Sequence, residues 1–372
     1  MEFNDLLKSM VKADASDMFV TAKLPVSAKI NGELLPIDTE VLTPEQSLAL
    51  VHFPMNNKQR RQFEEEKECN YAISVNGIGR FRISAFWQRD MAGMVLRRIV
   101  TDIPDIDQLG LPQILKEIVM SKRGLVLFVG GTGTGKSTSM ASLINYRNHN
   151  SYGHILTIED PIEFVHEHGK SMITQREVGL DTESFDAALK SSLRQAPDVI
   201  LIGEIRSQET MEHALAFAET GHLCIATLHA NNANQAIDRI MHLVPAEQHD
   251  KLLFDLALNL RGIVAQQLIP TKDGLNRVAA IEVLLNSPYV AELIKKGEIS
   301  GIKEVMEKSK ELGMQTFDQA LFDLYQRGLI FYADALHHAD STNDLRLMIK
   351  LRSNEQGGVG SLSDITIEGL EP

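Results

Sequence analysis

The stretch GLVLFVGGTGTGKSTSMASLI, residues 124–144, decides the fold of the chain. Residues 124–129 form a short apolar run with β-branched members, which predicts a buried parallel strand. The residues after it match the spacing G-x-x-x-x-G-K-[ST], and residues 138–146 are expected to be helical. The four matching residues are Gly130, Gly135, Lys136 and Ser137. An ordinary glycine-rich turn between a strand and a helix would not need this spacing, so we expect a phosphate-binding loop.

Each residue type in this loop has a chemical reason. Glycines let successive backbone N–H groups turn toward an anion, and the following helix directs its unpaired N–H groups at the same place. Lys136 supplies a positive charge for the β- and γ-phosphates, and Ser137 offers a hydroxyl to Mg²⁺. The residues expected to bind ATP are Gly130, Gly131, Thr132, Gly133, Thr134, Gly135, Lys136, Ser137 and Thr138.

Composition limits the kind of protein that carries this loop. The 372 residues allow two domains, and the 44% hydrophobic and 23% charged content is typical of a soluble globular protein. A net charge of −13 gives no basic surface in bulk, so we expect no nucleic-acid partner. The two cysteines, Cys69 and Cys224, exclude a disulfide framework and are expected to be buried thiols. No signal peptide or apolar run of ~20 residues is evident, which predicts a cytoplasmic protein.

The pattern along the chain predicts two domains, a linker and a tail. Residues 1–100 mix helix and hairpin signals, as in a small α+β domain. Residues 101–112 hold the prolines and acids of a linker. Residues 113–352 alternate apolar strands with amphipathic helices, which indicates an α/β domain with a largely parallel sheet. Residues 353–372 contain four acids and no base, and are expected to be disordered.

Local signals give detail to the first domain. Two-residue hairpin turns are expected at Asn31-Gly32 and Asn76-Gly77, each between alternating strands. Thr43 and Pro44 are expected to be the N-cap and first residue of a helix. The charged run KQRRQFEEEKE, residues 58–68, fits a partner surface but is more often a solvated helix face.

Three groups of polar residues follow predicted strands of the second domain. Glu159, Asp160 and Glu163 lie just past a strand, where a carboxylate could activate water beside a phosphate. Taken alone, such acids more often form a solvated loop or a helix cap. Glu204 follows the strand at 199–202, the position of a Mg²⁺-binding acid in phosphate-loop proteins, with a cap as the alternative. His229 ends a further strand and could sense the γ-phosphate, although a lone histidine is usually a satisfied polar residue.

Arginines occur on two predicted strands of the first domain. Arg80 and Arg82 share one face of a strand, since side chains alternate with period two. The return strand carries Arg97 and Arg98, and the sequence leaves open which of them shares that face, because a one-residue slip reverses it. Arginines can stabilise a transferring phosphate, but by pattern alone these are solvent-facing side chains.

Four ordered motifs resemble those of secretion-type ATPases: GGTGTGKSTSMASLI, ILTIEDPIEF, SLRQAPDVILIGEIR and ETGHLCIATLHANNANQAIDRI. Over roughly residues 1–350 the chain resembles the retraction ATPases of type IV pili, the PilT/PilU group. The resemblance implies a homo-hexamer whose subunits join a PAS-like N-terminal domain to a RecA-like ATPase domain, with ATP and Mg²⁺ between them. It also implies a cytoplasmic protein held at the inner membrane by the pilus platform protein.

The resemblance also implies roles for the candidate residues. Lys136 and Ser137 would belong to the Walker A loop, and Glu204 would be the Walker B acid that holds Mg²⁺ together with Ser137. Glu163 would be the general base and His229 the residue of the His box. The stretches RFRIS and VLRRI match the arginine strands of the family, which assigns Arg82 and Arg97 to the phosphates.

Departures from the family pattern indicate a particular role. Assembly-type relatives carry an extra N-terminal domain and a four-cysteine module, and both are missing from this sequence. Where the PilT type has A-I-R-N-L-I-R-E, this chain has YVAELIKK, in which Ala291 and Lys295 replace the two arginines. Ser207 stands where the PilT type has aspartate. These differences resemble the accessory, PilU-type motors of twitching motility, so a PilT-like ATPase is the expected partner.

Two other functions remain possible at this point. A RecA-like motor on nucleic acid would share the nucleotide site, but should show a basic track and salt-sensitive DNA binding. A nucleotide-binding scaffold that promotes retraction without useful hydrolysis would fit Ala291 and Ser207. The intact Lys136, Glu163 and Glu204 favour an ATPase whose turnover opens and closes the gap between the domains.

Overall fold

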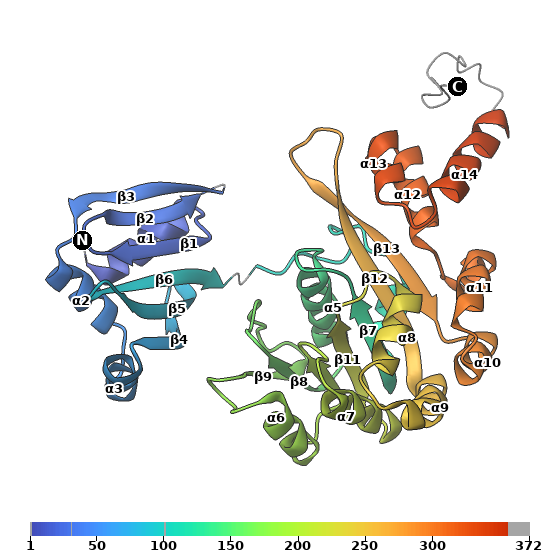
Figure 1. The fold of residues 1–372 in the computed structure, drawn as a ribbon, viewed down its shortest axis with the longest axis horizontal. Helices are drawn as coiled ribbons and strands as arrows, with labels where there is room; N and C mark the ends of the chain where they lie inside the picture. The colour runs from blue at the N-terminus through green and yellow to red at the C-terminus, as the bar shows by residue number, and fades with distance from the viewer. Residues whose placement is uncertain (1, 31, 100–101, 356–372) are drawn as a thin grey trace. The chain divides into compact units, whose positions relative to one another are not determined.

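The computed structural model describes residues 2–30, 32–99 and 102–355. The chain forms two compact units (Figure 1). The N-terminal unit comprises Met1–Ile103, Ile158–His168 and Ile173–Ala188, and the C-terminal unit Pro104–Thr157, Gly169–Met172 and Leu189–Pro372. The single boundary near residue 100 and the linker at 101–112 stay predictions, because two later segments group with the N-terminal residues. The predicted tail at 353–372 falls outside the described residues except for its first three, which end the last helix.

The N-terminal unit contains a six-stranded antiparallel sheet in the order β3-β2-β1-β6-β5-β4. Its strands are β1 (Asp17–Thr21), β2 (Pro25–Ile30), β3 (Glu33–Val41), β4 (Glu68–Val75), β5 (Gly79–Gln88) and β6 (Met91–Ile99). Its helices are α1 (Phe3–Lys12), α2 (Pro44–His52) and α3 (Asn57–Glu66). Alternation puts Phe81 and Ile83 of β5 on the buried face, in one apolar core with Leu6, Leu7 and Met10 of α1. The small α+β domain is therefore confirmed.

Local signals set most of these boundaries. The hydroxyl of Thr43 accepts a hydrogen bond from the N–H of Gln46, and the Gln46 side chain accepts one from the N–H of Thr43. This capping box starts α2 at Pro44, as predicted. Strands β2 and β3 pair up to Ile30 and Glu33, while Asn31 of the predicted turn lies outside the described residues. The turn between β4 and β5 has three residues, not two, because pairing ends at Val75 and Gly79.

The charged run between β3 and β4 is the helix α3, with its charged residues mostly exposed. Only one apolar residue of this helix, Phe63, is buried, and its ring stacks on Trp87 at 5.6 Å between centroids. Asn56 caps the helix by accepting hydrogen bonds from two backbone N–H groups. One anchoring aromatic ring on a polar helix agrees with the solvated-face interpretation.

The C-terminal sheet has seven strands in the order β13-β12-β7-β11-β10-β8-β9. Their bounds are β7 (Gly124–Val129), β8 (Gly153–Glu159), β9 (Ser171–Glu177), β10 (Val199–Ile202), β11 (Leu223–Leu228), β12 (Leu260–Pro270) and β13 (Arg277–Leu285). Strand β10 is parallel to β11, β11 to β7 and β7 to β12, and β13 runs antiparallel to β12. Every residue of β7, β10 and β11 is buried, as expected for the centre of a parallel sheet. The α/β class is confirmed.

Helices connect and extend this sheet (Figure 1). Those before β12 are α4 (Ile114–Val119), α5 (Lys136–Asn150), α6 (Phe185–Ser192), α7 (Gln208–Glu219), α8 (Ala233–Met241) and α9 (His249–Asn259). Those after β13 are α10 (Pro288–Lys296), α11 (Ile302–Lys308), α12 (Phe317–Gln326), α13 (Tyr332–His337) and α14 (Thr342–Glu355). None of the helices in the described part of the chain has the length and apolar character needed to cross a bilayer.

Candidate functional site

The predicted phosphate loop lies at the centre of the C-terminal sheet. Strand β7 runs between β11 and β12, and the chain turns through residues 130–135 into α5. The helix begins at Lys136, two residues earlier than predicted, and ends at Asn150. Its N-cap, Gly135, has a φ of +85°, a conformation that glycine adopts without strain. The loop is thus placed so that the N-terminus of α5 faces any anion bound to it.

Close packing against β12 holds this loop. A Cβ on Gly130 would lie 2.7 Å from the backbone oxygen of Gln266 and 2.7 Å from the hydroxyl of Thr134. The Gln266 side chain accepts a hydrogen bond from the Ser139 hydroxyl of α5 at 2.8 Å. The ammonium of Lys136 donates to the carbonyl oxygens of Gly130 and Gly131, at 2.6 and 2.7 Å. The loop therefore requires glycine at position 130 and keeps the lysine folded over its own backbone.

Strands β10 and β11 bring Glu204 and His229 together. The Nε2 atom of His229 lies 3.1 Å from Oε1 of Glu204, whose other oxygen accepts hydrogen bonds from Arg206. The Thr227 hydroxyl donates to the backbone oxygen of Gly203, which fixes the end of β10 against β11. Only 16% of the Glu204 side chain is exposed, so water and salt screen its charge weakly. His229 and Arg206 are the groups that stabilise this carboxylate.

His229 faces the phosphate loop. It lines a cavity of about 370 Å³ together with Gly131 of the loop, with Asn231 just before α8, and with Gln235 and Arg239 of α8. Because β7 lies beside β11, the carboxyl ends of these strands meet at one edge of the sheet. The structure thus brings together three of the predicted groups: the loop, Glu204 and His229.

A second, larger cavity also adjoins the loop. It measures about 930 Å³, and Gly135, Thr138 and Ser139 form part of its wall. The rest of the wall comes from residues 107–111, from the β12–β13 hairpin and from Arg327, just after α12. A volume of this size beside a phosphate loop suits the sugar and base of a nucleotide. The wall residues outside the loop and α5 were not predicted, because they carry no motif and lie far apart in the chain.

The segment 107–111 is tied to the helices near the loop. Asp107 accepts hydrogen bonds from the side chains of Gln113 and Lys116 at 2.8 and 2.9 Å. These bonds hold the pKa of the Asp107 carboxyl below its ordinary value, with Gln113 the larger cause. The ammonium of Lys116 also lies 5.5 Å above the ring of Tyr146 in α5. A stretch expected to be linker therefore forms a wall of the cavity.

Glu163 lies in the N-terminal unit, on the loop that follows β8. Its side chain is exposed, while the preceding Ile162 is buried and donates its N–H to the buried Glu177 at 3.2 Å. Burial lowers the pKa of the nearby His166 to about 4, so that imidazole is neutral at pH 7. The loop thus presents the Glu163 carboxylate to solvent from a well-anchored backbone.

Strand register settles which arginines share a face. Arg82 of β5 pairs directly with Arg97 of β6, and Arg97 pairs with Asp17 of β1 on its other side. Side chains of directly paired residues point to the same face, so Arg82 and Arg97 lie side by side. Arg97 is 73% exposed and forms an ion pair with Asp17 at 2.8 Å. Arg98 points to the opposite face, where it contacts Asp14.

This arginine pair has an electrostatic consequence. Like charges directly opposite each other on neighbouring strands destabilise a sheet. The Asp17 carboxylate pairs with Arg97, and the face also carries Arg80, whose buried Nε has no hydrogen-bond partner among the described residues. An anion bound to this face would relieve the repulsion. The strand register therefore places Arg82 beside Arg97, which the sequence left open.

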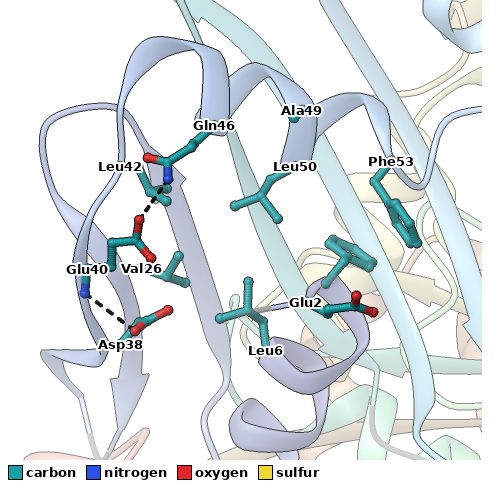
Figure 2. Close-up of a pocket in the computed structure, with 11 residues that line it drawn as sticks. Glu2, Leu6, Val26, Asp38, Glu40, Leu42, Gln46, Ala49, Leu50 and Phe53 are labelled. Atoms are coloured by element: carbon teal, nitrogen blue, oxygen red, sulfur yellow. Dashed lines mark hydrogen bonds between the residues drawn. The ribbon is translucent and has the colours of Figure 1, made fainter.

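One further cavity lies apart from these groups. Figure 2 shows an open pocket of about 340 Å³ in the N-terminal unit, where the Gln46 side chain donates to Glu40 at 2.7 Å. Its walls are apolar apart from this glutamine and three carboxylates, those of Glu2, Asp38 and Glu40. None of the predicted site residues lines it, so it is not part of the candidate site.

Both predicted thiols are buried and free, Cys69 in β4 and Cys224 in β11. Within the described ranges, His, Cys, Asp and Glu side chains form no group of three or more that could hold a metal ion.

A central parallel sheet, a phosphate loop and an acid–histidine pair at the adjoining strand ends define a P-loop nucleotide-binding protein. The family described as Type II/IV secretion system protein matches residues 2–317. The chain belongs to this family and, within it, to the PilT/PilU group.

Two relatives and one solved structure carry the assignment. The chain is 61% identical to the type IV pilus ATPase PilU of Pseudomonas aeruginosa, over 100% of this chain and 96% of that one. It is 41% identical to the type IV pilus retraction ATPase PilT of the same organism, over 91% and 98%. The crystal structure of the pilus retraction motor PilT with bound ADP superposes with a TM-score of 0.88 at 39% identity, covering 94% and 100%. The predicted RecA-like fold and family are confirmed.

Proposed function

We propose that this chain is an ATP-hydrolysing motor of type IV pilus retraction, an accessory ATPase of the PilU type that works with a PilT-like ring. The observation that carries the proposal is the cavity shared by Gly131 of the phosphate loop and His229, with Glu204 3.1 Å from that histidine. The names of two relatives, a type IV pilus ATPase and a type IV pilus retraction ATPase, support the proposal that ATP hydrolysis drives pilus retraction.

The phosphate loop binds the triphosphate of ATP. Backbone N–H groups from Gly130 to Thr138 and the positive end of α5 face the phosphates, and Lys136 exchanges its bonds to loop carbonyls for bonds to phosphate oxygens. The Ser137 hydroxyl and the Glu204 carboxylate are the hard oxygen ligands that Mg²⁺ prefers, and would hold it. Bound there, the ion would neutralise charge on the phosphates.

Three further groups act on the phosphates. Glu163, exposed on an anchored loop, takes the proton of the attacking water as general base. Arg82 and Arg97 stabilise the charge of the transferring phosphate from the N-terminal domain, which also relieves their mutual repulsion. His229 senses whether the γ-phosphate is present and passes this to Glu204. Loss of the γ-phosphate then releases the closed state of the two domains.

The assembly extends the proposal. We infer a homo-hexameric ring at the cytoplasmic face of the inner membrane, where the pilus platform protein receives the motion. The acidic net charge of −13 supports a protein partner over nucleic acid.

A nucleotide-binding scaffold without useful hydrolysis is the second candidate. The observation in its favour is Lys295, which replaces an arginine of the PilT type and whose ammonium lies 5.4 Å above the ring of Phe254. Lys295 thus contacts helix α9 of its own subunit through this ring.

A substitution at Lys136 tests the proposal. Lys136→Ala removes the charge that holds the β- and γ-phosphates, so phosphate release by the purified protein and pilus retraction in cells should both be lost. Lys122→Ala, at an exposed lysine just before β7, is the matched control and should change neither. Normal turnover in the Lys136 variant would refute the catalytic assignment. Pilus retraction by both the parent and the Lys136 variant, with no phosphate release from either, would establish the scaffold instead.

A further inference from the structure

One buried residue of β12 touches the phosphate loop near both of its ends. Gln266 is only 2% exposed and follows Ala265, which pairs with Val129, the last residue of β7. A Cβ on Gly130 would lie 2.7 Å from the backbone oxygen of Gln266. A Cβ on Gly135 would lie 2.7 Å from its side-chain Nε2. The loop therefore begins and ends against this residue.

The side-chain amide of Gln266 is anchored through its oxygen. Oε1 accepts a hydrogen bond from the hydroxyl of Ser139, in the first turn of α5, at 2.8 Å. The amide also carries two N–H donors on Nε2. Among the hydrogen bonds of the described residues, none is donated by this nitrogen. Because buried donors in proteins almost always have a partner, we expect a further group to bind beside it.

This donor lies at the wall of the 930 Å³ cavity. Gln266, Gly135 and Leu268 all line the cavity. The two Cδ atoms of Leu268 would lie 3.4 and 3.6 Å from a Cβ on Gly135, the same point that Nε2 approaches. Of the described polar residues in this wall, Ser139 and Gln266 are buried, and Ser139 directs its hydroxyl at Gln266. Nε2 is therefore the buried donor that the cavity offers to a ligand.

The place of the cavity along the loop indicates which part of a nucleotide would reach Nε2. Thr138 and Ser139 are among the described residues that line it, whereas residues 130–134 are not. The loop backbone and Lys136 supply the donors for the β- and γ-phosphates. Because the sugar joins the phosphates to the base, a nucleotide that leaves the loop past Thr138 brings its ribose into the cavity before its base. A ribose hydroxyl is a group that can accept a hydrogen bond from an amide.

We propose that Gln266 binds a ribose hydroxyl of the nucleotide, so that the site prefers ribonucleotides to deoxyribonucleotides. The inference rests on the proposed function, because it needs the phosphates of a nucleotide in the loop. Nε2 donates to the hydroxyl oxygen, while the bond from Ser139 to Oε1 keeps the amide from turning away. A nucleotide without this hydroxyl leaves the buried donor unpaired, and a site built in this way rejects such an analogue.

Calorimetric titration of the full-length protein with ADP, 2′-deoxy-ADP and 3′-deoxy-ADP tests the contact. The three ligands carry the same base and phosphates, so their affinities differ through one hydroxyl at a time. The parent should bind one of the two analogues about five- to tenfold more weakly than ADP, and that analogue identifies the hydroxyl. Equal affinities for all three ligands would overturn the proposal without any variant.

Two substitutions at Gln266 test whether this residue causes the preference. Gln266→Met keeps the length of the side chain but has no donor, so its preference for ADP should fall to about twofold or less. Gln266→Asn keeps the amide but withdraws it by one methylene group, and should lose the preference as well. This second variant keeps the test open if methionine disturbs folding. A merely structural role of Gln266 would weaken all three ligands alike and leave their ratio unchanged.

The next residue of β12 provides the matched control. Gln267 is not among the described residues that line the cavity, and its Oε1 lies 3.1 Å from Nδ1 of His338. Gln267→Met should therefore keep the preference of the parent. A loss in Gln267→Met equal to that in Gln266→Met would overturn the inference, since any change on this strand would then suffice.

The outcomes separate this inference from the proposed function. A preference for ADP that is unchanged in both Gln266 variants would overturn the ribose contact while leaving the nucleotide function intact. Failure of the parent to bind any of the three ligands would instead contradict the nucleotide function itself.

Discussion

Replacing one glycine of the phosphate loop at a time should show whether packing around the loop or its backbone conformation sets the shape of the loop. Gly130 and Gly133 lie three residues apart in one loop, with φ values of +151° and +78°. Both conformations strain an alanine. The difference lies in space, because a Cβ on Gly133 would meet nothing within 4 Å, whereas one on Gly130 would lie 2.7 Å from two oxygen atoms.

The magnitudes follow from these environments. Gly133→Ala should lower the unfolding free energy by about 1–2 kcal/mol, because a residue with a Cβ is strained in a left-handed backbone conformation. Gly130→Ala carries this strain and an overpacking cost of about 1–3 kcal/mol, for a total of about 2–5 kcal/mol. The contact cannot relax easily, because the oxygen of Gln266 belongs to β12, which is paired on both sides.

Urea unfolding and calorimetric titration with ADP would measure both effects. Gly130→Ala should also weaken ADP binding by tenfold or more, since a displaced loop loses hydrogen bonds to charged phosphates. The ADP affinity of Gly133→Ala should stay much closer to that of the parent. Equal stability and equal affinity in the two variants would refute the reasoning that packing against β12 sets the shape of the loop.

The remaining predictions concern catalysis, pH and thiol reactivity. Glu163→Gln should keep nucleotide affinity but lower turnover by about 10²–10⁴-fold, which titration and phosphate release would separate, and unchanged turnover would exclude the general base. Because burial in β13 raises the pKa of Glu282 from 4.5 to about 7, the native state binds the extra proton in this interval. Its contribution to the unfolding free energy, on the order of 3 kcal/mol, is therefore complete below pH 4.5 and is lost as pH rises through about 7. Urea unfolding at several pH values should show this fall of the unfolding free energy in the parent and in the control Glu304→Gln, which changes an exposed carboxyl of α11. Glu282→Gln should not show it. Burial raises the pKa of the Cys224 thiol, so a maleimide should modify it only on unfolding, and rapid labelling of the native protein would contradict its placement in β11.

Local sequence signals determined the parts of the fold that were predicted well. The phosphate loop follows from residue spacing alone, and the start of α2 follows from Thr43, Pro44 and Gln46. The helix after the loop extends two residues earlier and four later than predicted, since packing continues it to Asn150. The second hairpin turn differs by one residue, because Ile78 lies outside the strands and donates its N–H to Val75.

Non-local features could not be obtained in this way. The pairing of Arg82 with Arg97 depends on strand register, which a one-residue slip would reverse. The wall at 107–111 comes from residues that carry no motif and meet the loop only through the fold. Glu282 did leave a signal, a lone acid in the apolar run RVAAIEVLL, but the sequence does not reveal its partner, the backbone N–H of Ala233 at the start of α8.

Crystal structures with ADP and with a non-hydrolysable ATP analogue would test the central claim most directly. The account predicts that the guanidinium groups of Arg82 and Arg97 lie within about 3 Å of phosphate oxygens with the triphosphate and move away with the diphosphate. Finding both arginines remote from the ligand in the two structures, with the domains placed identically, would contradict it.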